Sequence, residues 1–303
     1  METIKMKARG HAGLFVAGII WGLNAPIGKE AMRYVPALAL SCYRMVGAAA
    51  AFLLLSLFLK RERVAWRDEG RLVIASLLGV AVNQGLFIQG LSLSTPVNAA
   101  IMTTTLPIIT MLLAAWLLRE PITGKKAGGV VLGATGAVIL ITSGGGFSLT
   151  GSVAGDLMCL AAQCSVALYL TLFKDLFVRY KPFTMLTRMF GYAAIFFLPF
   201  AWRDVSAVDY AVLPGIAWAE IAFVVFGGTF LAYIGFMLGQ KYLRPTVVSM
   251  YNYLQPIVAS LVAVWAGMDS FGPRKLLAVT LVFIGVYFVT MSKSREQMEQ
   301  SKS

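Results

Sequence analysis

The sequence predicts an all-α integral membrane protein in which ten transmembrane helices form two inverted five-helix repeats. The chain is 58% hydrophobic and only 13% charged. Apolar runs of about 20 residues, the length that crosses the hydrocarbon core of a bilayer, recur along it. In addition, residues 79–136 align with residues 228–285 at a constant offset of 149 without a gap. Because each unit holds an odd number of helices, its two copies must cross the membrane in opposite directions.

The aligned residues indicate a true duplication, since they are not limited to the Leu and Val matches that apolar helices show by chance. The thirteen identical positions include Gly79/Gly228, Gly90/Gly239, Pro96/Pro245, Pro107/Pro256, Trp116/Trp265, Lys126/Lys275 and Gly136/Gly285. The uncharged stretch from Thr142 to Ser152 contains four glycines and is the expected connection between the repeats. We therefore expect a first repeat at residues 11–143, a second at 152–292 and a cytoplasmic tail at 293–303.

Hydropathy and helix-breaking residues place the ten helices along the chain. They span residues 12–29, 36–59, 71–93, 96–118, 124–143, 153–176, 182–201, 216–240, 245–267 and 273–292. A cleaved signal peptide is the alternative interpretation of the first segment. We set it aside because Trp21, Asn24 and Pro26 interrupt that segment and no small-x-small cleavage site follows it.

The net charge of +12 comes from basic residues that are distributed unevenly among the loops. When successive loops are assigned to alternate sides, with the N-terminus inside, the termini and inner loops hold 19 basic residues and the outer loops hold five. This asymmetry follows the positive-inside rule and predicts that both termini are cytoplasmic. Topology thus accounts for the charge, and no nucleic acid partner is expected.

Several helices carry motifs that are specific for a fold. Trp-Gly-x-Asn begins at Trp21, Arg-Met occurs at Arg44 and at Arg188, and each repeat closes with Gly-x5-Pro-x10-Pro-x12 followed by an acid, Glu120 or Asp269. In these motifs the chain resembles the EamA-like branch of the drug/metabolite transporter (DMT) superfamily, whose YddG-like members export amino acids and other metabolites. The resemblance covers residues 11–292. It implies the EamA/DMT fold, outward transport around a central cavity, and a place in the bacterial inner (plasma) membrane.

Two prolines in predicted helix interiors mark the fourth and ninth helices. Pro107 and Pro256 each remove the hydrogen bond to a carbonyl four residues earlier, at Thr103 and Asn252. In hydrocarbon an unsatisfied carbonyl must face protein or a water-filled cavity, so these helices are candidates for lining a path. The alternative is a kink whose carbonyls bond to the hydroxyls of residues 103–105. We assign both prolines a gating or structural role.

Repeat symmetry selects the polar residues that could form a central site, because residues facing each other across the axis should be polar in both copies. Three pairs satisfy this condition: Asn24/Tyr169, Gln84/Tyr233 and Thr103/Asn252. In the family that the chain resembles, these helices line the central cavity. Amides, hydroxyls and rings suit a zwitterionic or weakly polar solute, whereas hydrogen bonds between helices are the alternative role. The candidate substrate-binding residues are Trp21, Asn24, Asn83, Gln84, Thr103, Tyr169, Tyr233, Tyr251, Asn252 and Gln255.

Arg44 and Arg188 are the basic residues placed inside predicted spans, and an intramembrane charge is a functional hypothesis by default. Each is about 9 to 12 Å from the start of its helix, close enough for the side chain to reach the interface. Two interpretations stay open: interfacial or carbonyl bonding, and carboxylate binding or gating. Because the repeats are inverted, the two arginines would lie toward opposite faces.

The acidic residues lie near predicted helix ends, and no cysteine pair has metal-ligand spacing with the single His11. We therefore expect no metal, no cofactor and no catalytic residue. The chain also has no Gly-x4-Gly-Lys-Ser/Thr loop, which excludes ATP-driven pumping by this chain alone.

We expect a secondary transporter that exports small polar metabolites, with amino acids as the leading class, by alternating access around a central cavity. Its partners would be the small-molecule substrate and the lipid bilayer, and a monomer is expected because one chain holds both halves. Efflux of amphipathic cationic drugs is an alternative that the tyrosines allow. A membrane enzyme acting on lipid-linked phosphates is a remote alternative, because no general base lies beside Arg44 or Arg188.

Overall fold

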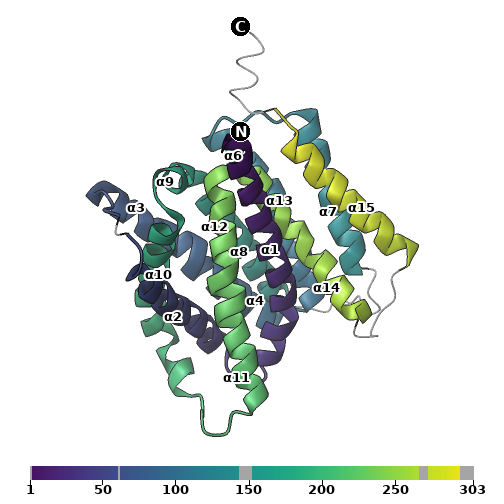
Figure 1. Ribbon diagram of the computed structural model, residues 1–303. Helices are drawn as coiled ribbons and strands as arrows, with labels where there is room; N and C mark the ends of the chain where they lie inside the picture. Colours follow the sequence, from purple (N-terminus) through teal and green to yellow (C-terminus); the bar gives the residue numbers. More distant parts are fainter. Residues whose placement is uncertain (1, 61, 143–151, 266–271, 294–303) are drawn as a thin grey trace.

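The computed structural model describes residues 2–60, 62–142, 152–265 and 272–293, and within these ranges every regular element is a helix. The helices run side by side, and the start of α1 lies at the same end of the bundle as the end of α15 (Figure 1). Nine helical stretches of the described chain are long and apolar enough to cross a bilayer. The protein is a multi-pass membrane protein. Residues 143–151 of the expected connection between Thr142 and Ser152, the acid Asp269 and nearly all of the expected tail lie outside the described residues.

The elements follow the expected segments in order. The first part of the chain forms α1 (Glu2–Ala31), α2 (Ala37–Ser56), α3 (Trp66–Ser76), η1 (Leu77–Val82), α4 (Asn83–Leu93), α5 (Pro96–Thr103), α6 (Leu106–Leu117) and α7 (Gly124–Thr142). The second part forms α8 (Val153–Leu172), α9 (Lys174–Arg179), α10 (Pro182–Ser206), α11 (Gly215–Ala222), η2 (Phe223–Leu231), α12 (Ala232–Tyr242), α13 (Pro245–Met250), η3 (Tyr251–Tyr253), α14 (Leu254–Trp265) and α15 (Pro273–Thr290).

Two of the expected helices are interrupted near their prolines. The segment expected at 96–118 is divided into α5 and α6 at Thr104 and Thr105, and the segment expected at 245–267 is divided by the 3-10 turn η3. Because proline cannot donate a backbone hydrogen bond, Pro107 and Pro256 weaken the turn that precedes each of them. The break expected near Pro256 thus divides the part of the segment 245–267 that the structure describes, which ends at Trp265.

The third and eighth spans contain π-helical stretches within otherwise α-helical runs. The stretch η1 lies between α3 and α4, and η2 lies between α11 and α12, so both occur at corresponding places of the two halves. A π-helical turn shifts the register of the side chains that follow it and is frequent at functional sites.

The helices pack in pairs drawn from the two halves of the chain: α1 with α12, α4 with α8, α2 with α10 and α7 with α15. Glycines allow the closest approaches. A Cβ on Gly129 would lie 2.7 Å from the carbonyl oxygen of Gly285, and one on Gly136 would lie 2.5 Å from that of Ala278. Contacts thus run backward along α15 as they run forward along α7, so the two helices are antiparallel.

Candidate substrate-binding site

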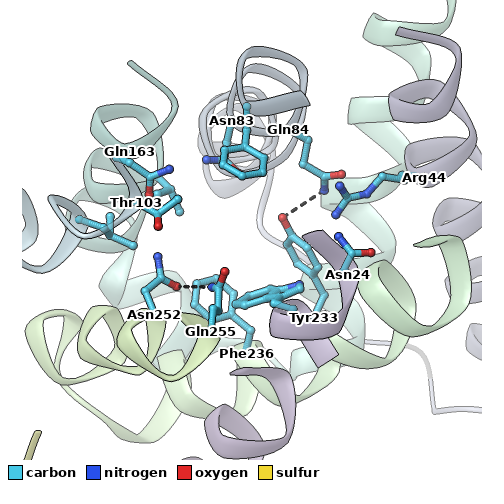
Figure 2. A pocket seen from close by; sticks show the side chains of 14 residues that line it. Asn24, Arg44, Asn83, Gln84, Thr103, Gln163, Tyr233, Phe236, Asn252 and Gln255 are labelled. Atoms are coloured by element: carbon cyan, nitrogen blue, oxygen red, sulfur yellow. Dashed lines mark hydrogen bonds between the residues drawn. The ribbon is translucent and has the colours of Figure 1, made fainter. Parts of the chain in front are cut away.

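A pocket of about 110 Å³ lies in the centre of the bundle, at the level of the interrupted helices. It is lined from both halves of the chain (Figure 2). The lining residues are Trp21, Asn24, Arg44, Asn83, Gln84, Phe87, Thr103, Leu106, Gln163, Val166, Tyr233, Phe236, Asn252 and Gln255. The structure therefore brings together all of the residues expected to bind substrate except Tyr169 and Tyr251.

Most of this lining consists of positions that correspond in the two repeats. Four corresponding pairs at the offset of 149 contribute both members: Gln84/Tyr233, Phe87/Phe236, Thr103/Asn252 and Leu106/Gln255. The members of one pair also touch each other, because Gln84 Nε2 donates to the Tyr233 hydroxyl at 3.1 Å. In the first helices of the two units, Trp21 and Val166 form a fifth pair.

Tyr169 was expected to mirror Asn24, but it lies outside the pocket. Its side chain is fully buried, its ring packs on Gly79, and its hydroxyl donates to Met189 Sδ at 3.7 Å. The ring fills the space that the missing side chain of Gly79 leaves between η1 and α8. Tyr169 thus packs between helices in this structure and is not among the residues that line the pocket.

Tyr251 also lies outside the pocket. Its hydroxyl is hydrogen-bonded to Nδ1 of His11 at 2.7 Å, so it connects η3 to α1. The 3-10 turn directs the neighbouring Asn252 toward the pocket instead, where Asn252 Oδ1 accepts a hydrogen bond from Gln255 Nε2 at 3.0 Å. The choice between the two neighbours depends on the turn, which sequence periodicity does not specify.

Aromatic side chains form one wall of the pocket. Trp21 Nε1 donates to the Gly228 carbonyl at 2.9 Å, and the Trp21 ring meets the rings of Phe236 and Tyr233 edge to face at centroid distances of 5.0 and 5.7 Å. This bond and these contacts hold the indole in one orientation. Phe87 and Phe236 were not predicted from the sequence, because apolar side chains at helical spacing are typical of a protein core. Their identity across the repeat is the signal that could have found them.

The polar side chains of the pocket are only partly satisfied. Asn83 Nδ2 donates to the Ala162 carbonyl at 2.9 Å. In contrast, Asn24 Oδ1 and Gln84 Oε1 are buried and have no hydrogen-bond partner. An unpaired buried acceptor is costly, so both oxygens favour a ligand that carries a donor.

The helix breaks are stabilised in two ways. At the end of α5 and the junction that follows it, the hydroxyls of Thr103, Thr104 and Thr105 donate to carbonyls three residues earlier, at 2.6 to 2.7 Å. From η3 the Tyr253 hydroxyl donates to the Thr104 carbonyl at 3.1 Å. Threonine bonding and cavity lining thus occur together in this segment, because Thr103 also lines the pocket.

The two intramembrane arginines lie in different surroundings. Arg44 is 5% exposed, lines the pocket and donates from Nε to Thr229 Oγ1 at 3.0 Å. Arg188 has a side chain that is 48% exposed, and it pairs with Glu69 at 3.3 Å. The two arginines, which correspond in the repeats, thus differ both in exposure and in partner.

A second cavity of about 720 Å³ lies between α2 and α10, and Arg188 is among its lining residues. Although it is larger, it is a lateral groove bordered by exposed Leu53, Leu57 and Ile195. Exposed apolar side chains on a membrane helix face lipid.

Within the described chain, no group of three or more His, Cys, Asp and Glu residues could hold a metal ion.

Comparison with known proteins agrees with this architecture. The chain is 24% identical over 297 residues to the uncharacterized transporter YetK of Bacillus subtilis (strain 168). This alignment covers 97% of this chain and 90% of that protein. It is also 24% identical over 338 residues to a WAT1-related protein of Arabidopsis thaliana, with coverage of 98% and 89%.

A solved crystal structure superposes with a TM-score of 0.76 at 19% identity and covers 94% of this chain and 97% of the other, which shows a shared fold. The sequence profile of the EamA-like transporter family matches residues 8–142 and 153–291, one match in each half. The protein therefore belongs to the EamA-like transporter family.

Proposed function

We propose that the protein is a secondary transporter that exports small polar metabolites, with amino acids as its leading substrate class. The observation that carries the proposal is the central pocket, which corresponding residues of the two halves line together. A site on a repeat axis is reached equally from either side, which is what alternating access requires. The resemblance to YddG-like exporters supports the outward direction.

The proposed mechanism rests on two inverted repeats, residues 11–143 and 152–292, of five transmembrane helices each. Support comes from contacts between corresponding residues. Tyr253 bonds to Thr104, its counterpart at an offset of 149, as Gln84 bonds to Tyr233. Such self-contacts arise where a pseudo-two-fold axis passes between the copies. Rocking of one unit against the other would then open the pocket to each side in turn.

The chemistry of the pocket favours a small solute with both donors and acceptors. The described lining holds amides, two hydroxyls, aromatic rings and one guanidinium group, and no Asp or Glu is among these residues. Amphipathic cationic drugs are a second candidate class, since the aromatic wall of Trp21, Tyr233 and Phe236 offers cation–π contacts. The nearby charge of Arg44 opposes such ligands, so we place amino acids first.

We further propose that the protein lies in a bacterial inner membrane with both termini in the cytoplasm and acts as a monomer. The excess of basic residues in alternate loops supports this orientation. A monomer is expected because both halves of the pocket belong to one chain.

The test is counterflow of labelled amino acids into proteoliposomes. We expect flux for at least one of the twenty amino acids, and a fall of about tenfold or more in Asn252→Ala, which loses a polar group of the pocket. Thr280→Ala, on the exposed face of α15, is the matched control and should keep wild-type flux. If none of the twenty amino acids moves, the substrate class is wrong; ethidium flux under the same conditions would favour the drug alternative.

A further inference from the structure

Arg44 is a buried cation for which the pocket supplies no anion. We propose that its guanidinium group is the subsite that binds a carboxylate of the transported solute. The inference rests on the proposed transport function and adds to it a chemical requirement: the solute carries a carboxylate, and it carries it at this end of the pocket.

The position of Arg44 leaves the two terminal nitrogens of its guanidinium group available to a solute in the pocket. Its side chain comes from α2, reaches the pocket and is 5% exposed. Only Nε has a hydrogen-bond partner among the described residues, Thr229 Oγ1 at 3.0 Å. Figure 2 shows the guanidinium group at the edge of the pocket, on the side of Gln84 and Asn24. The two terminal nitrogens are thus left for a ligand.

The charge of Arg44 has no counter-ion in the described chain. None of the ion pairs found there includes Arg44. Burying a charge is costly unless it is paired and hydrogen-bonded. An anionic group that enters the pocket would supply both the charge and the acceptors.

The geometry around Arg44 fixes the guanidinium plane. Thr229 lies in η2, and its hydroxyl donates to the Val224 carbonyl five residues earlier at 2.8 Å. Its oxygen is therefore oriented to accept from Arg44 Nε. A guanidinium group held at Nε presents its two terminal nitrogens as a fork, which matches the two oxygens of a carboxylate. Thr229 acts as a positioning residue.

Arg188 provides an internal comparison, since it occupies the corresponding place in the second unit. It is paired with Glu69 at 3.3 Å, and Glu69 also accepts from the Tyr192 hydroxyl at 2.6 Å. Its charge is already compensated and half exposed. The structure therefore assigns carboxylate recognition to Arg44 alone.

The experiment measures ligand-induced thermal stabilisation of the purified protein, which does not depend on flux. The probes are the twenty amino acids, each paired with its carboxamide, in which the carboxylate is replaced by a neutral group. We expect stabilisation by at least one amino acid and at least about tenfold weaker apparent binding of its carboxamide, because a charge-assisted pair is lost.

Variants locate the effect. Arg44→Gln should abolish the preference for carboxylate over carboxamide, and Arg44→Lys should keep part of it, because the charge stays but the fork is lost. Thr229→Val, which lacks the hydroxyl, should weaken the preference. Thr229→Ser, which has the hydroxyl, should keep it. A purely structural role of Thr229 would not change the preference in this way. Arg188→Gln should leave the preference unchanged. Size-exclusion profiles identify any variant that fails to fold, and the threonine pair then carries the test.

Equal binding of amino acids and carboxamides, or no stabilisation by any amino acid, would overturn the inference. So would a preference that persists in Arg44→Gln. Carboxylate-dependent binding without flux in proteoliposomes would leave the inference standing and refute the transport proposal. Flux that does not distinguish carboxylate from carboxamide would leave the transport proposal standing and refute the inference about Arg44.

Discussion

At the residue scale, glycines decide how closely the paired helices approach. Gly129 and Gly136 of α7 lie against the backbone of α15, and Gly133 lies beneath the ring of Tyr253. In a membrane, where apolar burial gives little driving force between helices, such close contacts supply the packing energy. Glycine is needed at these positions because a side chain would collide with the neighbouring helix, and not because the backbone adopts a conformation that only glycine allows.

Gly129→Ala is expected to destabilise the protein by about 1 to 3 kcal/mol, because the added methyl group would force α7 and α15 apart. The control is the adjacent Gly128→Ala, where a Cβ would meet nothing within 4 Å. That variant should keep or raise stability, since alanine is the better helix former. Thermal unfolding in detergent measures both, and equal midpoints would contradict the packing argument.

At the element scale, two helices are interrupted where the pocket lies, and one side chain bridges the breaks. The Tyr253 hydroxyl donates to the Thr104 carbonyl at 3.1 Å and lies 3.4 Å from the Val130 carbonyl. It thereby connects η3 to the junction of α5 and α6. The broken helices leave backbone polar groups free at the level of the pocket. The hydrogen bond from Tyr253 to Thr104 reduces the loss of stability that the break causes.

Tyr253→Phe should lower the free energy of unfolding by about 1 to 3 kcal/mol, because the Thr104 carbonyl would lose a partner in a buried setting. Tyr287→Phe, which removes a hydroxyl from a residue that is 59% exposed, is the control and should have little effect. Chemical unfolding of the purified variants tests the difference. Equal losses in the two variants would show that the bridge contributes nothing.

The short helix α9 is tied to the end of α12 by Lys174, whose Nζ donates to the carbonyls of Gln240 and Leu243. A lysine at this position satisfies carbonyls that the helix end leaves free. Burial lowers the pKa of Lys174 to about 8, below its ordinary 10.5. The folded protein therefore releases this proton at a lower pH than the unfolded chain does.

The sign of the pH dependence follows from linkage. Between pH 8 and 10.5 the unfolded chain binds more protons at Lys174 than the folded protein, so this group's contribution to stability rises with pH in that window. Below pH 8 both states are protonated and the contribution is constant. We expect the stability difference between wild type and Lys174→Met to shift in favour of wild type from pH 8 to 10. A difference that stays flat would contradict the lowered pKa.

At the scale of the whole molecule, charged and apolar side chains occupy different parts of the surface. Ion pairs that join separate elements, such as Asp68 with Arg179 at 2.6 Å and Arg71 with Asp175 at 2.7 Å, link α3 to α9. Many exposed apolar side chains, such as Leu54 and Phe200, lie on membrane-spanning helices. A belt of apolar side chains that faces lipid, with charged side chains outside it, is typical of a membrane protein.

Cysteine labelling tests the orientation. In a chain whose Cys42, Cys159 and Cys164 are replaced by alanine, a membrane-impermeant maleimide applied to intact cells should label Val212→Cys and spare Lys125→Cys. Val212 is 73% exposed in the loop between α10 and α11, which the charge pattern places outside. Permeabilised cells should label both, and the reverse pattern in intact cells would invert the proposed topology.

Much of the fold was accessible from the sequence because its determinants are local. Apolar runs define the spans and prolines define the breaks. The duplication then places Gln84 opposite Tyr233 and Thr103 opposite Asn252, and the structure brings all four to one pocket. Repeat symmetry succeeds here because it restricts positions in space as well as residue type.

Only the tertiary structure decided which member of a symmetric pair does what. Tyr169 packs into the space beside Gly79, while Asn24 faces the pocket. Arg44 meets Thr229, whose counterpart at the offset of 149 is Val80, a side chain that cannot accept a hydrogen bond. The sequence by itself determined the helices, their duplication and the level of the pocket, because hydropathy and proline act locally. The direction and pairing of each side chain depend on neighbours from distant helices, which only the packed bundle brings together.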